Sequence, residues 1–226
     1  MKLLLISNSG TPLYHWCKKE IADFLGERKV LFVSAANVFD PEKYYNDANK
    51  SLAEVGIKLT HLNLDKTPDK QIEETESILV GGGNTYHLLS ELRKARLIGT
   101  IRRKIKNGIP YVGLSAGANI AGPNILTTND WNVVSSKVFE ALGLVPFNIN
   151  PHYVGPHDKK KFSGESRDDR IKEYHEIQSD NVLGIEEKTM VFIEDIKIKV
   201  AGEGKVKLFV KNQNPKEYKN GESFRF

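Results

Sequence analysis

Ser115 stands in the run Gly113-Leu114-Ser115-Ala116-Gly117, where two glycines frame a serine after a short apolar segment. This G-x-S-x-G pattern is typical of a nucleophile elbow, a strand-to-helix turn that lifts a serine hydroxyl above the end of a sheet. Glycine is needed on both sides because a Cβ there would clash with the tightly folded backbone. The pattern predicts acyl transfer with Ser115 as nucleophile. A capped turn without chemistry is the alternative that these five residues leave open.

A serine hydroxyl needs a base within hydrogen-bonding reach before it can attack at neutral pH. His152 is the best candidate among six histidines, because it ends an alternating apolar run directly after Asn150-Pro151. Proline holds the preceding backbone extended, and α/β proteins present catalytic side chains at strand ends. His157, in the glycine-proline loop that follows, is the second candidate. His61 lies on the polar side of an alternating strand and is expected to face solvent.

The base needs a third group that holds its tautomer and balances the imidazolium charge. Asp130, downstream of the elbow, and Glu187, in a turn between two predicted strands, are both candidates, and residue order does not choose between them. The developing oxyanion needs two donors. The Ala116 N–H follows the nucleophile directly, and the loop Gly81-Gly82-Gly83 ends a strand and opens a helix, so it is placed to supply the second donor.

Other chemistries find less support in the sequence. The triple glycine lacks the G-x-G-x-x-G spacing and the lysine of a P-loop, so nucleotide binding is not expected. His152 and His157 have no third partner at metal-ligand spacing, so no metal is predicted. Cys17 is the one cysteine, which excludes an internal disulfide, and its spacing among apolar helix positions predicts a buried thiol.

The composition indicates an ordinary globular protein. The 226 residues are 39% hydrophobic and 27% charged, and we expect one domain over residues 1–226. The net charge of +4 is distributed along the chain, which argues against a nucleic-acid partner. The apolar start ends at residue 7, too short for a signal peptide, and no run has the length of a membrane span. A cytoplasmic protein without a membrane partner is therefore expected.

The elements that would position these residues alternate along the chain. Apolar runs predict five strands, at residues 2–7, 30–33, 57–62, 77–80 and 109–114. Amphipathic segments between them predict helices, the first from Thr11-Pro12 to about residue 25. This alternation predicts an α/β fold with a mostly parallel sheet covered on both faces. Short apolar runs after residue 181 predict antiparallel hairpins at one edge of that sheet.

Five motifs then occur in order along the chain: Gly81-Gly82-Gly83-Asn84-Thr85, Gly113-Leu114-Ser115-Ala116-Gly117-Ala118-Asn119, Thr127-Thr128-Asn129-Asp130, Asn150-Pro151-His152 and Gly164-Glu165-Ser166-Arg167. Together they resemble the serine peptidase family of peptidase E, the bacterial aspartyl dipeptidase, which also includes cyanophycinase. The resemblance covers nearly the whole chain. It implies a three-layer α/β sandwich of the class I glutamine-amidotransferase type, in agreement with the predicted alternation.

The resemblance also implies an activity, that of a cytoplasmic serine dipeptidase that needs no cofactor. Such an enzyme hydrolyses dipeptides with N-terminal aspartate through an acyl-enzyme. Ser115 would be its nucleophile and His152 its base, with Gly83 and Ala116 as oxyanion donors.

Arg167 and Asn84 would contact the substrate. A guanidinium can bind the aspartyl carboxylate through two parallel hydrogen bonds. In this family the third triad position has been attributed both to the aspartate of the T-T-N-D motif, here Asp130, and to a later glutamate, here Glu187. We favour Glu187, because its extra methylene lets it reach from a hairpin turn, and Asp130 would then organise the substrate end.

Two other functions remain open at this stage. One is a cyanophycinase-like peptidase that acts on β-linked aspartyl-arginine and needs a groove for a longer substrate. The other is a catalytically inactive binding relative that keeps the sheet. The oligomeric state is also open, with a homodimer as one alternative.

Overall fold

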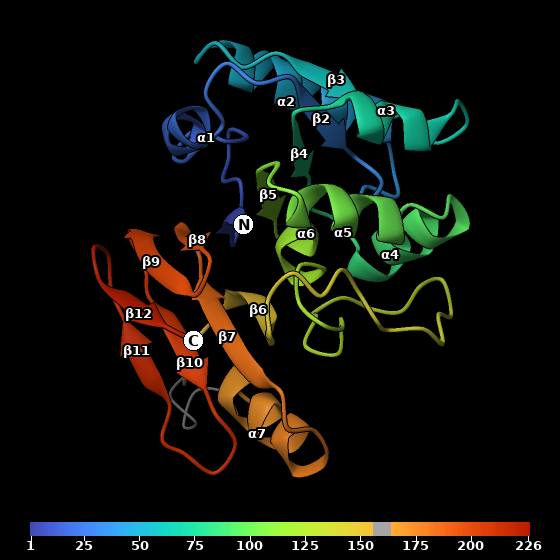
Figure 1. The fold of residues 1–226 in the computed structure, drawn as a ribbon. Helices are drawn as coiled ribbons and strands as arrows, with labels where there is room; N and C mark the ends of the chain where they lie inside the picture. Colours follow the sequence, from blue (N-terminus) through green and yellow to red (C-terminus); the bar gives the residue numbers. More distant parts are fainter. Residues whose placement is uncertain (156–163) are drawn as a thin grey trace.

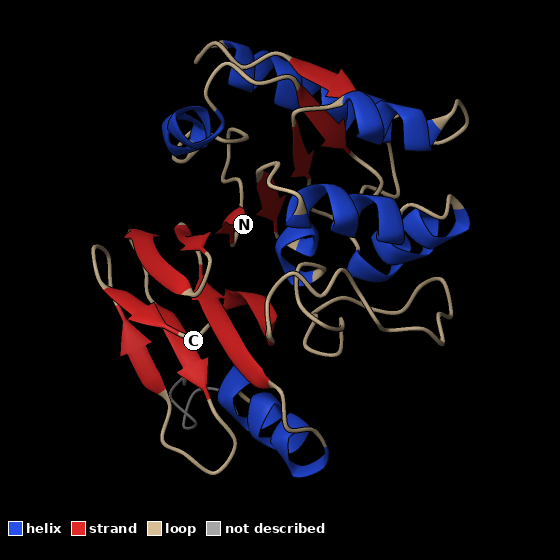
Figure 2. Ribbon diagram, viewed as in Figure 1, coloured by secondary structure: helices blue, strands red, loops and turns tan. Residues whose placement is uncertain are grey.

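A central parallel sheet carries the strands that were predicted to alternate with helices (Figures 1 and 2). The computed structural model describes residues 1–155 and 164–226. Within them, the larger sheet has the strand order β12-β9-β8-β1-β5-β4-β2-β3. Its parallel strands are β1 (Lys2–Ile6), β2 (Val30–Val33), β3 (Leu59–His61), β4 (Ser77–Val80) and β5 (Tyr111–Leu114).

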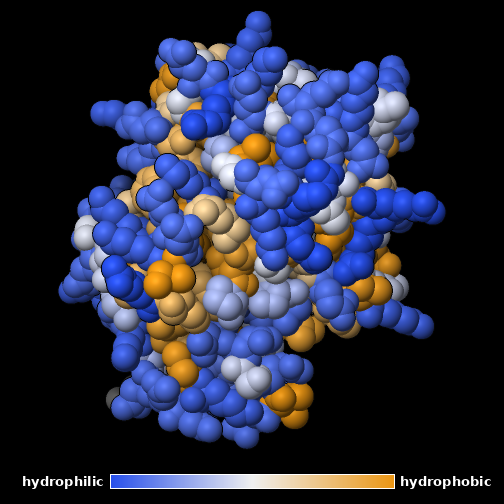
Figure 3. Space-filling model, in the orientation of Figure 1, coloured by the Kyte–Doolittle hydropathy of each residue, from blue (hydrophilic) through white to orange (hydrophobic). Residues whose placement is uncertain are grey.

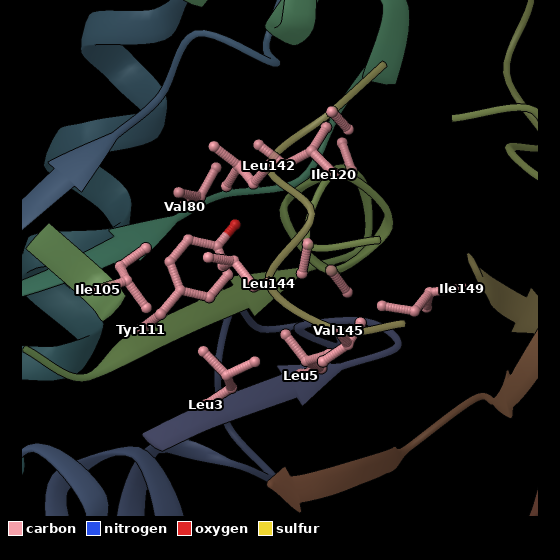
Figure 4. Close-up of a cluster of buried hydrophobic side chains, with 14 of the residues drawn as sticks. Leu3, Leu5, Val80, Ile105, Tyr111, Ile120, Leu142, Leu144, Val145 and Ile149 are labelled. Carbon is pink, nitrogen blue, oxygen red and sulfur yellow. The ribbon is translucent and has the colours of Figure 1, made fainter. Parts of the chain in front are cut away.

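Both faces of this sheet are buried. Successive side chains of a strand point to opposite sides, so each strand contributes to two apolar clusters. Leu3 and Leu5 of β1 join one apolar cluster, whereas Leu4 and Ile6 join another. Figure 4 shows the first cluster, with Leu3, Leu5 and Tyr111 packed together on one side of the sheet. Strands buried on two faces read as continuous apolar runs, which is why the sequence predicted them well.

Helices cover the two faces. The face of Leu4 and Ile6 packs against α1 (Lys18–Leu25) and α2 (Pro41–Ala53). The opposite face packs against α3 (Pro68–Glu74), α4 (Thr85–Lys94), α5 (Ile98–Lys106) and α6 (Ala116–Asn119). This arrangement confirms the predicted three-layer α/β sandwich.

The first helix is shorter than predicted. Residues 11–17 form turns, and α1 begins only at Lys18. Tyr14 has a φ of 63°, in the left-handed region that an α-helix cannot contain. Cys17 is fully buried, as predicted, at the point where the helix starts.

The C-terminal strands depart further from expectation, because they divide between two sheets. Antiparallel strands β8 (Thr189–Glu194), β9 (Lys197–Gly202) and β12 (Ser223–Arg225) extend the larger sheet beyond β1. A second sheet has the order β11-β10-β7-β6 and consists of β6 (Phe147–Tyr153), β7 (Asn181–Glu186), β10 (Val206–Phe209) and β11 (Lys216–Tyr218). Helix α7 (Arg167–Ile177) connects β6 to β7, which run parallel.

The surface in Figure 3 is mostly hydrophilic, and the hydrophobic residues on the face shown form separate small patches. The most exposed large apolar side chains are Phe39, Trp131 and Ile177. In the two described ranges, no helix combines the length and hydropathy needed to cross a bilayer.

Candidate active site

The elbow forms where β5 runs into α6. Ser115, half-buried, has φ 50° and ψ −108°, a strained conformation for a residue with a Cβ. The two flanking glycines explain how the turn packs. A Cβ at Gly113 would lie 2.4 Å from the Gly117 carbonyl oxygen, and one at Gly117 would lie 2.3 Å from the Val80 carbonyl oxygen. Both glycines are therefore required by close backbone approach, as the motif predicted.

A hydrogen-bonded chain of three side chains meets at this elbow. Ser115 Oγ lies 2.7 Å from His152 Nε2, and His152 Nδ1 lies 2.5 Å from Glu187 Oε1. A hydrogen on Nδ1 is held by the carboxylate, which leaves Nε2 free to accept the serine proton. His152 itself has a φ of 55°, at an irregularity where the β6–β7 register shifts.

Glu187 follows β7 directly, and β7 pairs with β6, so the second sheet brings the base and its carboxylate together. The structure thus places Ser115, His152 and Glu187 in contact. The second candidate base, His157, lies outside the described residues.

Two residues that the sequence analysis did not single out hold this chain in place. The Ser7 hydroxyl accepts the His152 N–H at 2.8 Å and donates to the Ile185 carbonyl oxygen at 3.0 Å. Asn8 donates from Nδ2 to Glu187 Oε2 and accepts the Lys188 N–H at 3.1 Å. The sequence did contain a signal for them: polar residues follow β1 directly. Because β1 is parallel to β5, these residues lie at the same sheet edge as the elbow.

The glycine loop faces the nucleophile. A Cβ at Gly82 would lie 3.1 Å from Ser115 Cβ. Three N–H groups of this loop have acceptors. The Gly81 N–H donates to the Val33 carbonyl oxygen, the Gly82 N–H to the Tyr44 hydroxyl and the Asn84 N–H to the Ala36 carbonyl oxygen.

The Gly83 N–H has no acceptor in the part of the chain that the structure describes, and neither has the Ala116 N–H. Gly83 has a φ of 139°, and a Cβ there would lie 2.2 Å from the Ala36 carbonyl oxygen, so only glycine fits. Both predicted oxyanion donors are therefore free to bind a substrate oxygen.

Asp130 lies away from the imidazole. Its Oδ2 accepts the Thr85 N–H at 2.7 Å, the Thr85 hydroxyl at 2.6 Å and the Thr128 hydroxyl at 3.1 Å. The carboxylate thus stabilises the N-terminus of α4. Asn84 is the N-cap of the same helix: its Oδ1 accepts the His87 N–H and its Nδ2 donates to the Trp131 carbonyl oxygen. These bonds hold the Asn84 side chain at the helix end, and its contact with a substrate stays a prediction.

The T-T-N-D segment also supports the base. Asn129 donates to the Pro151 carbonyl oxygen at 2.6 Å, and Asn150 donates to the Thr127 carbonyl oxygen at 2.8 Å. The end of β6 is therefore tied to this loop immediately before His152.

Arg167 begins α7 and lines a cavity of about 560 Å³ together with Thr127, Asn129 and Asn150. The charged residues Glu165, Arg170 and Glu173 line the same cavity. Burial, with a contribution from nearby Arg170, lowers the pKa of the half-buried Arg167 guanidinium below its ordinary value. No carboxylate in residues 1–155 or 164–226 pairs with it. A partly desolvated cation facing a cavity is suited to an anionic group.

A second Ser–His–Glu set lies elsewhere at the same sheet edge. Ser34 Oγ is 2.7 Å from His61 Nε2, and His61 Nδ1 is 3.1 Å from Glu42 Oε2. The expectation that His61 faces solvent is wrong, since only 22% of its side chain is exposed and its ring stacks on Tyr45. The alternating pattern placed His61 on the polar face of its strand, but Glu42 and Tyr45 of α2 lie against the ring.

The fold and the site define a serine peptidase with an α/β core. Residues 3–201 match the family model described as Peptidase family S51, and the chain belongs to that family. The class I glutamine-amidotransferase-like fold predicted from the motifs agrees with this assignment.

Similar proteins span most of the chain. A peptidase E of Nostoc sp. is 36% identical, with 96% of this chain and 92% of the relative covered. A probable alpha-aspartyl dipeptidase of Drosophila melanogaster is 39% identical, with 92% and 89% covered. The fold is similar to a peptidase from an acI-B1 actinobacterium, with a TM-score of 0.72 at 19% identity over 100% of this chain and 96% of that one.

Proposed function

We propose that this protein is a dipeptidase that hydrolyses Asp-Xaa dipeptides through an acyl-enzyme on Ser115. The observation that carries the proposal is the continuous chain Ser115–His152–Glu187, which faces two backbone amides without acceptors, at Gly83 and Ala116. A nucleophile, its base, a carboxylate behind the base and two free donors are the parts that acyl transfer needs.

In this mechanism Ser115 Oγ attacks the scissile carbonyl carbon while its proton passes to His152 Nε2. Glu187 stabilises the imidazolium through Nδ1, and the amides of Gly83 and Ala116 donate to the oxyanion. His152 then protonates the leaving amine as the C–N bond breaks. Water repeats the sequence on the acyl-enzyme, which releases aspartate and restores the serine.

Selectivity for aspartate is supported by Arg167. Its half-buried guanidinium faces a cavity bordered by Asn150, two residues before the base. A bidentate pair with the substrate's β-carboxylate would compensate for the desolvation that lowers the pKa of Arg167. An apolar or cationic side chain at the same place would leave that charge unpaired.

The test is release of aspartate from Asp-Leu by the purified protein, with Asn-Leu, Glu-Leu and β-linked Asp-Arg as comparison substrates. Asp-Leu is expected to be hydrolysed at least about tenfold faster than Asn-Leu, because a neutral amide gives up a charge-assisted pair. Faster hydrolysis of β-Asp-Arg would instead indicate the cyanophycinase-like activity.

The nucleophile is tested with a serine-directed phosphonate. The reagent is expected to add its mass to the peptide containing Ser115 in the wild type and to leave Ser115→Ala unmodified, while both proteins unfold at the same temperature. A wild-type protein that neither reacts nor cleaves any of the four substrates would support the inactive binding relative.

A further inference from the structure

A second cavity, of about 360 Å³, is lined by the nucleophile itself, unlike the cavity of Arg167. It is lined by Ser115 and His152, by the glycine loop, and by two segments that come from other strand ends: residues 8–13 after β1, and Asn37 with Tyr44 around the start of α2. It shares no lining residue with the cavity of Arg167. For a substrate whose scissile carbonyl is attacked by Ser115 and whose aspartyl side chain occupies the Arg167 cavity, this is the cavity that remains beside the nucleophile for the leaving residue.

The cavity presents hydrogen-bond donors that have no acceptor among the residues described. The backbone N–H groups of Ser9, Gly10 and Thr11 are unpaired in this sense. Gly10 has a φ of 75°, and a Cβ there would lie 2.6 Å from the His15 ring. Positive φ at such a position lets neighbouring amides converge on one point, an arrangement that captures anions.

Asn37 adds a side-chain donor whose orientation is fixed. Its Oδ1 accepts the N–H groups of Phe39 and Asp40, each at 3.0 Å, so the amide nitrogen must point the other way. Tyr44 accepts the Gly82 N–H at 3.0 Å, and its hydroxyl also meets the hydroxyl of the buried Tyr14. Both side chains line the cavity.

Charge decides which part of a dipeptide fits. None of the described residues that line this cavity is Asp, Glu, Lys or Arg. An α-ammonium group would find no carboxylate here, whereas a carboxylate, which only accepts hydrogen bonds, would find several free donors. The leaving residue of every Asp-Xaa dipeptide carries such a carboxylate at its C-terminus.

We infer that this cavity binds the free C-terminal carboxylate of the leaving residue, through the Asn37 amide and the backbone amides of residues 9–11. The inference rests on the proposed function and deepens it, because the enzyme would then recognise both the aspartyl side chain and the C-terminal carboxylate of a dipeptide. Recognition of C-terminal carboxylates by convergent backbone amides is a general mode of peptide binding. A longer peptide would place a neutral amide where the cavity is built for an anion.

The experiment compares Asp-Leu with Asp-Leu-amide in the wild type and in Asn37→Asp. The aspartate keeps the acceptor that holds Phe39 and Asp40 but replaces the free donor with a negative oxygen. The wild type is expected to favour the free acid by about tenfold or more in kcat/KM. Asn37→Asp should lower kcat/KM for Asp-Leu by about 10- to 100-fold, as loss of a hydrogen bond to a charged group does, and change the amide by less than about threefold.

Asn63→Asp is the matched control, because Asn63 Oδ1 also accepts a loop N–H, from Asp65, but lies outside this cavity. It should leave both substrates unchanged. Equal hydrolysis of acid and amide by the wild type, or an equal loss on both substrates in Asn37→Asp, would overturn the inference.

Failure of the proposed function is distinguishable. If neither compound is cleaved, binding of Asp-Leu and Asp-Leu-amide to Ser115→Ala, measured by calorimetry, still decides whether the carboxylate is read: tighter binding of the acid by about tenfold supports the inference, and equal binding rejects it.

Discussion

Two hydrogen-bonded Ser–His–Glu sets lie at one edge of the same sheet, and their comparison shows what a nucleophile requires beyond residue types. In both sets the serine lies 2.7 Å from Nε2 of its histidine, and a glutamate oxygen faces Nδ1. Ser34 follows β2 and Ser115 follows β5, which are separated only by β4 in the sheet. Residue identity and contact distance therefore do not separate them.

The backbone conformation around each serine does separate the two sets. Ser115 has a positive φ, is followed by a helix and lines a cavity bounded by the glycine loop. Ser34 is 4% exposed, has no positive φ, and is followed by a turn that the Asn37 N–H closes onto the Ser34 carbonyl oxygen. Ser34 and His61 also line a cavity, of about 250 Å³, so a neighbouring cavity does not separate the two sets. What differs is the strained turn, which presents the Ser115 hydroxyl beside free amides, whereas Ser34 lies at an ordinary strand end. We interpret the Ser34 set as a structural clamp that joins β2, β3 and α2.

Replacing each histidine by alanine should give the largest contrast between the sets. His152→Ala removes the base and is expected to lower kcat on Asp-Leu by about 10⁴-fold or more, because the triad acts as a unit. His61→Ala should retain activity within about threefold but lower the free energy of unfolding by about 1–2 kcal/mol, since it loses two hydrogen bonds and a ring stack. Steady-state kinetics and urea unfolding measure both; similar activity losses in the two variants would erase the distinction.

The glutamates should differ by less. In Glu187→Gln a neutral amide faces the imidazolium, so kcat is expected to fall by about 10²- to 10⁴-fold with KM little changed. Glu42→Gln should alter neither kcat nor, by more than about 0.5 kcal/mol, stability, because Glu42 is 70% exposed and an exposed pair contributes little. A Glu187→Gln variant with wild-type kcat would remove this carboxylate from the proposed mechanism.

Ser34→Ala gives the smallest expected effect. It removes one hydroxyl from a partly buried ring nitrogen and should destabilise the protein by about 1 kcal/mol. Activity should be unchanged, and the phosphonate should still modify Ser115. Modification at Ser34, found by peptide mass mapping, would show that the clamp is also reactive.

The sequence predicted those parts of the site whose cause is local. Gly113 and Gly117 mark the elbow because backbone contact distances there exclude a Cβ, and that constraint is visible as a residue pattern. The proline before His152 marked a strand end in the same way. The helix expected from Thr11 failed for a local reason too, since the left-handed Tyr14 interrupts it without an obvious residue signal.

The third member of the triad could not be predicted from local sequence. From the residues alone, Asp130 and Glu187 were equal, and the preference for Glu187 came from family resemblance and reach. Pairing of β7 beside β6, in a sheet that the sequence did not separate from the first, puts Glu187 on the imidazole. Asp130 instead receives the donors at the start of α4.

By itself, then, the sequence determined the alternating core, the elbow with its serine, and the histidine at a strand end, because each depends on neighbours a few residues away. Tertiary structure decided which carboxylate stands behind the base, that Ser7 and Asn8 hold both, and that a second Ser–His–Glu set forms at an ordinary strand end. Those outcomes depend on contacts between different strands and helices: His152 and Glu187 are 35 residues apart in the chain, and Ser7 and His152 are 145 apart. Information of this kind is not present in local spacing.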